Sequence, residues 1–413
     1  MATPSAPSRR DFLRTVAVAS AAASIPALAG KVRAISPRFS GGGKRILILG
    51  GTGFLGPETV EVALARGHHV TIFNRGRTEE RKGPMFAGKE VERLVGDRDP
   101  TKGEGLKSLE GKKFDAVVDN SGYVPRIVSA SAELLAPNAG HYLFISSVSV
   151  YKDNSRAGDD ETAAVGTMTD ETVEEMGAQF ENYGPLKALC EKAAEKAMPG
   201  RTTAVRPGLI VGPNDPTDRF TYWPVRVDRG GEVLCPGSPE DPIQVIDVRD
   251  LAEWVVMLIE SKTTGTYDAL GPQSGLTIGK LITACQAASG KPSTLTWADA
   301  EFLEQQRVSP WSEMPVWLPA VGEMSGMHRR NVSRAVAAGL KFRDISHTVK
   351  DTLTWWPKEL ERRIRVTAEI KAKAKAEGKP EPAMANPNEL RAGITASREK
   401  DVLAAWAARP KNG

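Results

Sequence analysis

Short apolar runs alternate with amphipathic stretches over the first half of the chain. The apolar runs are rich in β-branched and aromatic residues and lie at 44–50, 69–74, 91–97, 114–120 and 141–147. Their length and composition are typical of buried strands. Helical patterns lie between them, most clearly at 57–66 and 126–135. Strands that alternate with helices predict an α/β fold, in which helices cover both faces of a parallel sheet.

The pattern becomes less regular in the second half of the chain. A strand is predicted at 202–211, after a helix at 182–198, and the Pro and Gly content rises beyond Gly212. Shorter elements are predicted after that point, at 243–248, 251–261 and 277–289. This arrangement predicts a smaller, irregular α+β lobe that is added to the sheet.

These patterns divide the chain into four parts. They are a leader and linker at 1–40, a sheet domain at 44–212, a smaller lobe at 213–356, part of which can return to the sheet domain, and a charged helical tail at 357–413. Helices are predicted in the tail at 358–378 and 397–408. A chain of 413 residues is long enough for two or three such units.

Composition places the body among ordinary globular proteins and excludes several other classes. Apolar residues make up 40% and charged residues 26% of the chain, so a large core can form. Cys190, Cys235 and Cys285 have no short spacing, which is untypical of a zinc site or a disulfide framework. The five histidines also lack metal-ligand spacing, and we predict no metal. No long apolar run of membrane-spanning length occurs, so stable insertion into a membrane is not expected.

The formal net charge of +4 is unevenly distributed along the chain. Residues 1–43 and 357–413 each carry an excess of five positive charges, so the body between them is acidic. A protein that binds the phosphates of a nucleic acid needs a concentrated basic surface. The sequence of the body offers none, and we expect no nucleic-acid partner.

The N-terminus has the features of an export address. Arg9 and Arg10 precede a soft stretch of Ala, Val and Ser, and Ala27-Leu28-Ala29 forms a small-residue cleavage site. Paired arginines, a short apolar region and a small-residue cut look like a twin-arginine export signal. We therefore predict an exported, periplasmic protein that is cleaved near Ala29 and has the twin-arginine export machinery as a partner. The alternative is a cytoplasmic protein whose basic tail contains Arg-Arg by chance.

A glycine-rich loop lies where the first predicted strand meets the first helix. Gly50, Gly53 and Gly56 have the G-x-x-G-x-x-G spacing, with Phe54 and Leu55 between the last two. Glycine permits a tight turn and the close approach of a pyrophosphate, while the following helix offers free N–H groups. In this position the loop predicts a Rossmann-type, doubly wound sheet that binds a dinucleotide, with these five residues as candidate cofactor contacts.

The ends of the next strands carry candidate contacts for the rest of the cofactor. NAD-binding proteins usually have an acidic residue at the end of the second strand, but this chain has Asn74 followed by Arg75 and Arg77. An arginine can pair with a 2′-phosphate, so the cofactor is NAD or NADP, with NADP slightly favoured by Arg75. Asp97 ends the third strand and could accept a hydrogen bond from the adenine amino group. Ser121 follows the fourth strand, beside the expected path of the cofactor.

A catalytic group is predicted from a Tyr-x-x-x-Lys spacing. Tyr183 and Lys187 lie four residues apart on the predicted helix at 182–198, so both are on one face. A phenol is a poor base at neutral pH, and we expect the neighbouring ammonium to lower its pKa. The phenolate could then take a proton from a substrate hydroxyl as hydride leaves. Ser147, at the end of the fifth strand, could donate a hydrogen bond to the same oxygen.

Four segments together resemble the extended short-chain dehydrogenase/reductases, and within them the NAD-dependent epimerase/dehydratase family. They are Gly-Gly-Thr-Gly-Phe-Leu-Gly at 50–56, Phe-Ile-Ser-Ser-Val-Ser-Val-Tyr at 144–151, Tyr-Gly-Pro-Leu-Lys at 183–187 and Arg-Pro-Gly-Leu-Ile-Val-Gly-Pro at 206–213. The resemblance covers about residues 44–290. It implies that Ser147 and Tyr183 are catalytic, that Lys187 holds the nicotinamide ribose, and that Arg206 and Pro207 lie beside the nicotinamide.

The resemblance also implies where a substrate would bind, and on this point the sequence is less specific. Tyr123, Tyr151, Tyr222 and Arg226 occupy positions where this family contacts its substrate. Aromatic rings and an arginine suit a polar, sugar-like or anionic small molecule. The alternative is that the aromatic residues around Tyr222 pack the interface between the two lobes. By analogy with the family, a homodimer is also expected.

An exported member of this family would work without an evident supply of fresh reduced nicotinamide. We therefore predict an epimerase/dehydratase-type oxidoreductase that oxidises a substrate hydroxyl transiently and returns the hydride, with tightly bound NAD(P). One alternative is a cytoplasmic NADP-dependent reductase of a carbonyl substrate. Another is an RNA-binding protein on a dehydrogenase fold, which the acidic body and the intact Tyr183 and Lys187 disfavour.

Overall fold

A seven-stranded sheet forms the centre of the larger domain in the computed structural model, which describes residues 42–83 and 85–409. The strand order is β10-β6-β5-β4-β1-β2-β3, and every pairing is parallel. The strands are β1 (Arg45–Leu49), β2 (His69–Asn74), β3 (Val91–Val95), β4 (Ala116–Asp119), β5 (Tyr142–Ile145), β6 (Thr202–Pro207) and β10 (Gly265–Ala269). The predicted doubly wound parallel sheet is therefore confirmed. The predicted export signal lies outside the described residues.

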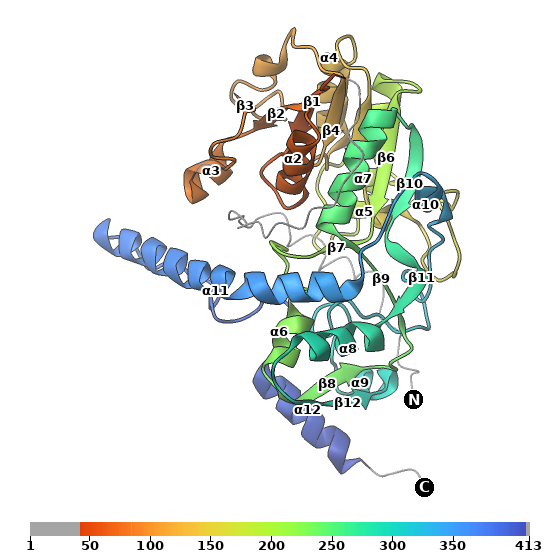
Figure 1. The fold of residues 1–413 in the computed structure, drawn as a ribbon, viewed down its shortest axis with the longest axis vertical. Coiled ribbons are helices and arrows are strands. Elements are labelled where there is room, and N and C mark those ends of the chain that lie inside the picture. The colour runs from red at the N-terminus through yellow and green to blue at the C-terminus, as the bar shows by residue number, and fades with distance from the viewer. Residues whose placement is uncertain (1–41, 84, 410–413) are drawn as a thin grey trace.

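Helices cover both faces of this sheet (Figure 1). α2 (Leu55–Ala65) and α7 (Val248–Ser261) pack together on one face, and α4 (Pro125–Leu135) and α5 (Tyr183–Ala197) pack together on the other. Alternate residues of β1 enter the two cores: Ile46 and Ile48 pack with α2 and α7, while Leu47 and Leu49 pack with α4 and α5. Because both faces are buried, β1 is apolar almost throughout. Short elements connect these layers, namely α3 (Arg77–Lys82), η2 (Lys107–Leu109) and η3 (Val148–Val150).

The smaller lobe consists of two small sheets and four helices around a separate apolar core. One sheet has the order β11-β9-β7, with β7 (Leu209–Val211), β9 (Pro242–Asp247) and β11 (Gly271–Thr277). The other pairs β8 (Gly231–Pro236) with β12 (Ser293–Ala298). The helices are α6 (Tyr222–Asp228), α8 (Ile278–Ala288), α9 (Ala300–Gln305) and α10 (Ser333–Ala337).

The single strand predicted at 202–211 is wrong, because the structure divides it between the two lobes. β6 belongs to the large sheet, whereas β7 pairs with β9 in the smaller lobe. The break is at Gly208, whose N–H donates to the carbonyl of Ala269 at 3.1 Å. A Cβ at position 208 would lie 2.8 Å from Cβ of Leu270, so the crossing point has no room for a side chain.

The segment that follows the crossing point contributes to both lobes. α7 packs on the large sheet, and β10 forms its edge strand beside β6. The lobes are therefore joined by several passages of the chain. This arrangement brings residues of the smaller lobe to the carboxyl ends of the large sheet, where ligands of such sheets bind.

The C-terminal tail begins with a helix longer than the sequence predicts. α11 spans Ile345–Ala376 and contains Pro357, whereas the predicted helix starts at 358. The earlier start is favoured by Asp344, whose side chain accepts a hydrogen bond from the N–H of Ser346, and by packing of Val349 on the smaller lobe. The end of α11 extends away from the body, and α12 (Ala396–Ala408) returns to the smaller lobe (Figure 1). Among the described residues, no helix is both long and apolar enough to cross a membrane.

Candidate active site

The glycine loop between β1 and α2 forms a close-fitting cradle at the carboxyl end of the sheet. Gly50 has φ +86°, in the region that favours glycine, and a Cβ there would lie 2.9 Å from Cβ of Ser121. A Cβ at Gly56 would lie 2.5 Å from the carbonyl oxygen of Gly50. Gly53, in contrast, is exposed and adjoins open space. The loop is therefore tight against the protein and open on the side from which a pyrophosphate would approach.

Two polar side chains beside this loop have no protein partner. Both the side-chain oxygen and the nitrogen of Asn120 are buried, and neither forms a hydrogen bond within the described part of the chain. The hydroxyl of Ser146, at the end of β5, is in the same state. A buried polar group without a partner costs about 1–3 kcal/mol. These atoms are therefore available to a polar ligand that lies across the ends of β4 and β5, such as a bound dinucleotide.

The predicted adenine-side residues lie at the ends of β2 and β3. The side-chain oxygen of Asn74 accepts a hydrogen bond from the N–H of Gly76 at 2.8 Å, which fixes the turn, and Arg75 is exposed. A carboxylate oxygen of Asp97 accepts a hydrogen bond from the N–H of Asp99 at 3.0 Å. The sheet brings these residues to the same edge as the glycine loop, because β2 pairs with β1 and β3 pairs with β2 in parallel.

A buried ion pair that the sequence analysis missed supports Ser121. One guanidinium nitrogen of Arg98 donates to Asp119 at 2.7 Å, and the hydroxyl of Tyr142 donates to the same carboxylate at 2.7 Å. The other oxygen of Asp119 accepts a hydrogen bond from the N–H of Ser121 at 3.1 Å. Ser121 is thereby held against Gly50 of the loop. An acidic residue at the end of a buried strand was the available signal, but the sequence does not show its partner.

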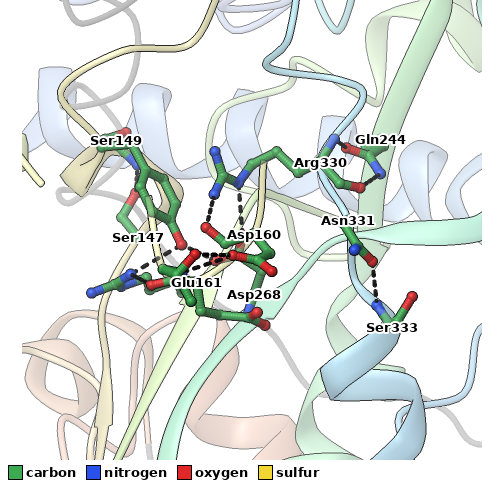
Figure 2. Close-up of polar contacts among 12 residues, drawn as sticks. Ser147, Ser149, Asp160, Glu161, Gln244, Asp268, Arg330, Asn331 and Ser333 are labelled. Carbon is green, nitrogen blue, oxygen red and sulfur yellow. Dashed lines mark hydrogen bonds and ion pairs between the residues drawn. The ribbon is translucent and has the colours of Figure 1, made fainter. Parts of the chain in front are cut away.

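Ser147 and Tyr183 come together at the carboxyl end of β5. The Ser147 hydroxyl accepts a hydrogen bond from the N–H of Ser149 at 3.1 Å, which caps η3 (Figure 2). The side chain of Ser147 lies close enough to the phenol of Tyr183, the first residue of α5, to lower the pKa of that phenol. The Tyr183 ring lies 6.4 Å from the Tyr123 ring, between centroids. The structure thus places Tyr123 beside the predicted catalytic pair.

The pKa of Tyr183 differs from the sequence-based expectation. Burial is the largest influence and raises the pKa above its usual value, while the Ser147 side chain and the charge of Arg219 lower it. The expectation that Lys187 would lower the phenol pKa below its usual value is therefore wrong. The physical reason is that the ring is desolvated, which disfavours the phenolate.

Lys187 is buried and points toward the ends of two strands. Its ammonium donates to the carbonyls of Gly122 at 2.7 Å and Ile145 at 2.6 Å. It also lies 4.2 Å from the centroid of the Phe144 ring. Burial lowers the pKa of Lys187 to about 8. The ammonium is thus a positioned cation at the junction of β4 and β5.

Arg206 and Tyr151 belong to a buried polar network at the junction of the lobes. Figure 2 shows Asp268 and Arg330 of this network. Arg206 donates to Glu191 at 2.6 Å and to the Tyr151 hydroxyl at 3.0 Å. The Tyr151 hydroxyl donates to Asp268 at 2.6 Å, and Arg330 donates to the other oxygen of Asp268 at the same distance. Burial raises the pKa of Asp268 to about 6. The Tyr151 side chain is fully buried and its hydroxyl is engaged, so the structure gives it a role in joining the lobes.

Pro207 ends β6, where it pairs with Ala269 of the edge strand.

Figure 2 also shows how the smaller lobe holds Arg330 by its backbone. The side-chain oxygen of Gln244 accepts a hydrogen bond from the N–H of Arg330 at 2.9 Å, and its nitrogen donates to the carbonyl of Arg330 at 3.0 Å. The network therefore spans both lobes, from the large sheet to the segment before α10.

Two predicted substrate residues on α6 are engaged with the C-terminal tail. Arg226 donates to Glu399 of α12 at 2.6 Å and to the carbonyl of Gly230 at 3.1 Å. The Tyr222 ring is buried, and Gly393 of the tail packs so closely against it that any side chain at 393 would overlap the ring. The structure does not bring Arg226 to the predicted catalytic residues.

Arg219 is a further residue of the site that the sequence analysis missed. It lies in the segment between β7 and α6, and its charge lowers the pKa of Tyr183. Its guanidinium carbon is 5.2 Å from the centroid of the Trp311 ring. No sequence signal marks it, because its neighbours come from distant segments. Elsewhere in the described part of the chain, no cluster of His, Cys, Asp and Glu is arranged to hold a metal ion.

The chain is similar in sequence to a plant protein and to a mammalian protein. The chain is 27% identical over 264 residues to the "chloroplast stem-loop binding protein of 41 kDa b" of Arabidopsis thaliana. The match covers 60% of this chain and 64% of that protein, so this chain spans less than two thirds of that relative's length. It is 25% identical over 269 residues to "epimerase family protein SDR39U1" of Bos taurus, covering 60% of this chain and 82% of that protein.

A solved structure with a similar fold is that of the Bordetella bronchiseptica enzyme WbmG in complex with NAD. It has a TM-score of 0.55 and 18% identity, and the match covers 77% of this chain and 96% of that one. The family model described as the NAD dependent epimerase/dehydratase family matches residues 46–269. This match extends from β1 to the end of β10 and includes the glycine loop and the Ser147–Tyr183 pair. The chain belongs to the NAD dependent epimerase/dehydratase family.

Proposed function

We propose that this protein is an epimerase/dehydratase-type oxidoreductase that acts on a hydroxyl of a sugar-like or polar small molecule, with NAD or NADP as its cofactor. The observation that carries the proposal is the convergence of Ser147 and Tyr183 next to the glycine cradle. Lys187 lies at the same strand ends. The unpartnered amide of Asn120 supports a polar ligand between the cradle and this group.

In the proposed mechanism, the side chains move and hold protons. When bound, NAD(P) supplies the acceptor and donor of hydride. Tyr183 takes the proton of the substrate hydroxyl and returns it, while the hydrogen bond from Ser147 stabilises the phenolate. Burial raises the pKa of Tyr183, so the free protein holds the neutral phenol. Before oxidation the phenol must release its own proton to solvent, and the resulting phenolate then accepts the proton of the substrate hydroxyl. The cation of Lys187, held by two backbone carbonyls, stabilises negative charge at these strand ends.

We further propose that the protein is exported through the twin-arginine route and works in the periplasm. The support is Arg9-Arg10 followed by a short apolar stretch and a small-residue cleavage site. In that compartment, an enzyme that returns the hydride to its own substrate has no need of fresh cofactor. A fractionation experiment tests the localisation: the Arg9→Lys/Arg10→Lys double variant should stay in the cytoplasm, and its appearance in the periplasm at the normal level would contradict the proposal.

The main test asks what the purified protein already carries. The protein is denatured with nothing added, and the released nucleotide is identified by absorbance and mass. One equivalent of NAD or NADP is expected, because a self-returning reaction retains its cofactor. A protein that is isolated empty and turns over only with stoichiometric added NAD(P)H would overturn the proposed reaction.

Two other functions have specific observations in their favour. The exposed Arg75 favours an NADP-dependent reductase, and consumption of added NADPH with a carbonyl substrate would show it. The name of the Arabidopsis thaliana relative favours binding to stem-loop RNA. Salt-sensitive retention of a stem-loop RNA on a filter by the full chain would support that function. The acidic composition of the body disfavours it.

A further inference from the structure

Arg219 is a buried arginine that forms no direct ion pair within the described part of the chain. The residue is 7% exposed, and its Nη1 is buried without a hydrogen-bond partner among the described residues. Its Nε donates to the hydroxyl of Thr217 at 3.1 Å. No described carboxylate lies within the ion-pair distance of 4.0 Å from its guanidinium. The guanidinium therefore has capacity left for another acceptor.

The other deeply buried arginines show how unusual this is within the molecule. In the described part of the chain, four more arginines are equally buried, and each has a carboxylate partner within 2.7 Å: Arg206, Arg226, Arg330 and Arg363. A buried charge is normally paired, because removing it from water costs several kcal/mol. The missing partner of Arg219 is thus expected to be a ligand.

The position of Arg219 indicates which part of a ligand it would meet. Its charge acts on the phenol of Tyr183, so the guanidinium lies near the predicted proton-transfer group. The Trp311 ring forms a wall 5.2 Å away. Asp215, which is fully buried, has one carboxylate oxygen without a partner and interacts electrostatically with Arg219. Arg219 and Asp215 thus offer one positively charged donor and one acceptor for a hydroxyl.

We propose that Arg219 binds an oxyanion of the substrate, a carboxylate or a phosphate, next to the hydroxyl that Tyr183 deprotonates. This inference rests on the proposed function and adds the substrate class, an acidic or phosphorylated polyhydroxy compound. The oxyanion accepts a hydrogen bond from Nη1, for which the described residues provide no acceptor. A hydroxyl of the same molecule donates to the free oxygen of Asp215.

The C-terminal tail holds the Arg219 segment from behind. Asp218 has φ +61°, an unfavourable conformation for a residue with a side chain. Its two carboxylate oxygens accept hydrogen bonds from Arg363 of α11 at 2.7 Å each, and the N–H of Arg391 donates to it at 2.9 Å. With Asp218 fixed toward the tail, Arg219 is directed toward Tyr183 before the ligand arrives, which reduces the entropy lost on binding.

Binding to the cofactor-loaded protein tests the proposal. The probes are D-glucuronate, α-D-glucose 1-phosphate and neutral methyl α-D-glucoside, measured by calorimetry. At least one anionic probe should bind about tenfold more tightly than the glucoside, and Arg219→Gln should remove the difference. Arg229→Gln, at an exposed arginine just past the end of α6, is the matched control and should leave it unchanged. The anion that is preferred identifies the source as a carboxylate or a phosphate.

The unfolding temperature provides a second test of the role of Arg219. Because a bound anion supplies the acceptor that Nη1 of Arg219 lacks, at least one anionic probe should raise the unfolding temperature of the unchanged protein, and Arg219→Gln should abolish that rise. No rise with either anion, or equal binding of all three probes to the unchanged protein, would overturn the inference. The nucleotide content separates the two proposals: a cofactor-loaded protein without anion preference contradicts only the role of Arg219, whereas a protein without any cofactor contradicts the proposed function.

Discussion

The two sides of the proposed active site are assembled in different ways. The cofactor side consists of short loops that follow adjacent parallel strands, so each contact lies within a few residues of a strand end. The substrate side depends on the segment before α6, on Trp311, and on the tail residues Arg363 and Arg391. The first side is set by local motifs. The second side forms only when distant segments have packed. Its main cation is Arg219, whose Nη1 has no hydrogen-bond partner among the described residues.

The largest expected effect is at Tyr183, the first residue of α5 and the proposed proton-transfer group. Tyr183→Phe removes the hydroxyl that transfers the proton, and the turnover rate should fall by about 10²–10⁴-fold. The released-nucleotide assay should show unchanged cofactor content. Tyr123→Phe is the matched control, since its ring is the neighbour of Tyr183 and its loss of a hydroxyl should change the rate much less. Equal losses in the two variants would show that the proton passes by another route.

The next effect is on the substrate side, where the tail holds the site. Arg363→Met leaves Asp218 buried without its ion pair and should lower the free energy of unfolding by about 3–5 kcal/mol. Denaturant titration measures it. Arg365→Met breaks an exposed pair with Glu369 on the same helix and should cost about 0–1 kcal/mol. If both variants lose the same small amount, the tail is not part of the folded unit that positions Arg219.

The junction between the two sides should respond to pH through Asp268. Its pKa is raised to about 6 by burial and by Glu161, so between about pH 4 and 6 the folded protein keeps a proton that the unfolded chain has lost. This group therefore reduces stability as pH rises through that range, by up to about 3 kcal/mol. Asp268→Asn should flatten this part of the profile of unfolding temperature against pH. An unchanged slope would show that Arg330 keeps Asp268 ionised throughout.

The smallest effect concerns the choice of cofactor. Arg75→Ser should weaken NADP binding by about tenfold or less, since an exposed arginine–phosphate pair contributes about 1 kcal/mol, and should leave NAD binding unchanged. Lys371→Ser, on the exposed part of α11, serves as the charge-matched control. Fluorescence titration of both nucleotides gives the ratio. Equal affinities of the variant and the unchanged protein for NADP would remove the reason to favour NADP over NAD.

The sheet and the cofactor side were largely predictable from the sequence because each depends on neighbouring residues. Apolar runs marked the strands, and the spacing of Gly50, Gly53 and Gly56 marked the turn before α2. The exceptions have steric causes. The strand at 202–211 is continuous in composition, and only the approach of Leu270 to Gly208 shows why it divides. The predicted tail helix starts at 358, just after Pro357, yet packing of the preceding turns carries α11 through this proline.

The substrate side was not predictable because a side chain's role there depends on partners far away in the sequence. Tyr151 and Arg226 have residue types that suit substrate contacts, but Asp268 and Glu399 engage them inside the protein. Arg219 resembles any other arginine in a polar segment until the structure shows that its Nη1 is buried without a partner among the described residues. Burial without a partner is a three-dimensional property, and no local pattern encodes it.

Gly393 offers a way to retune this enzyme from a distance. Gly393 adopts φ +98°, and the Tyr222 ring fills the space that a side chain at 393 would need. Tyr222 follows Arg219 by three residues in the sequence. An alanine at this position would push the tail and α6 apart, because its Cβ would overlap the Tyr222 ring. A mutant library at position 393 could therefore yield variants with altered substrate preference and the same proton-transfer residues. The tail is thus a target for directed evolution of specificity.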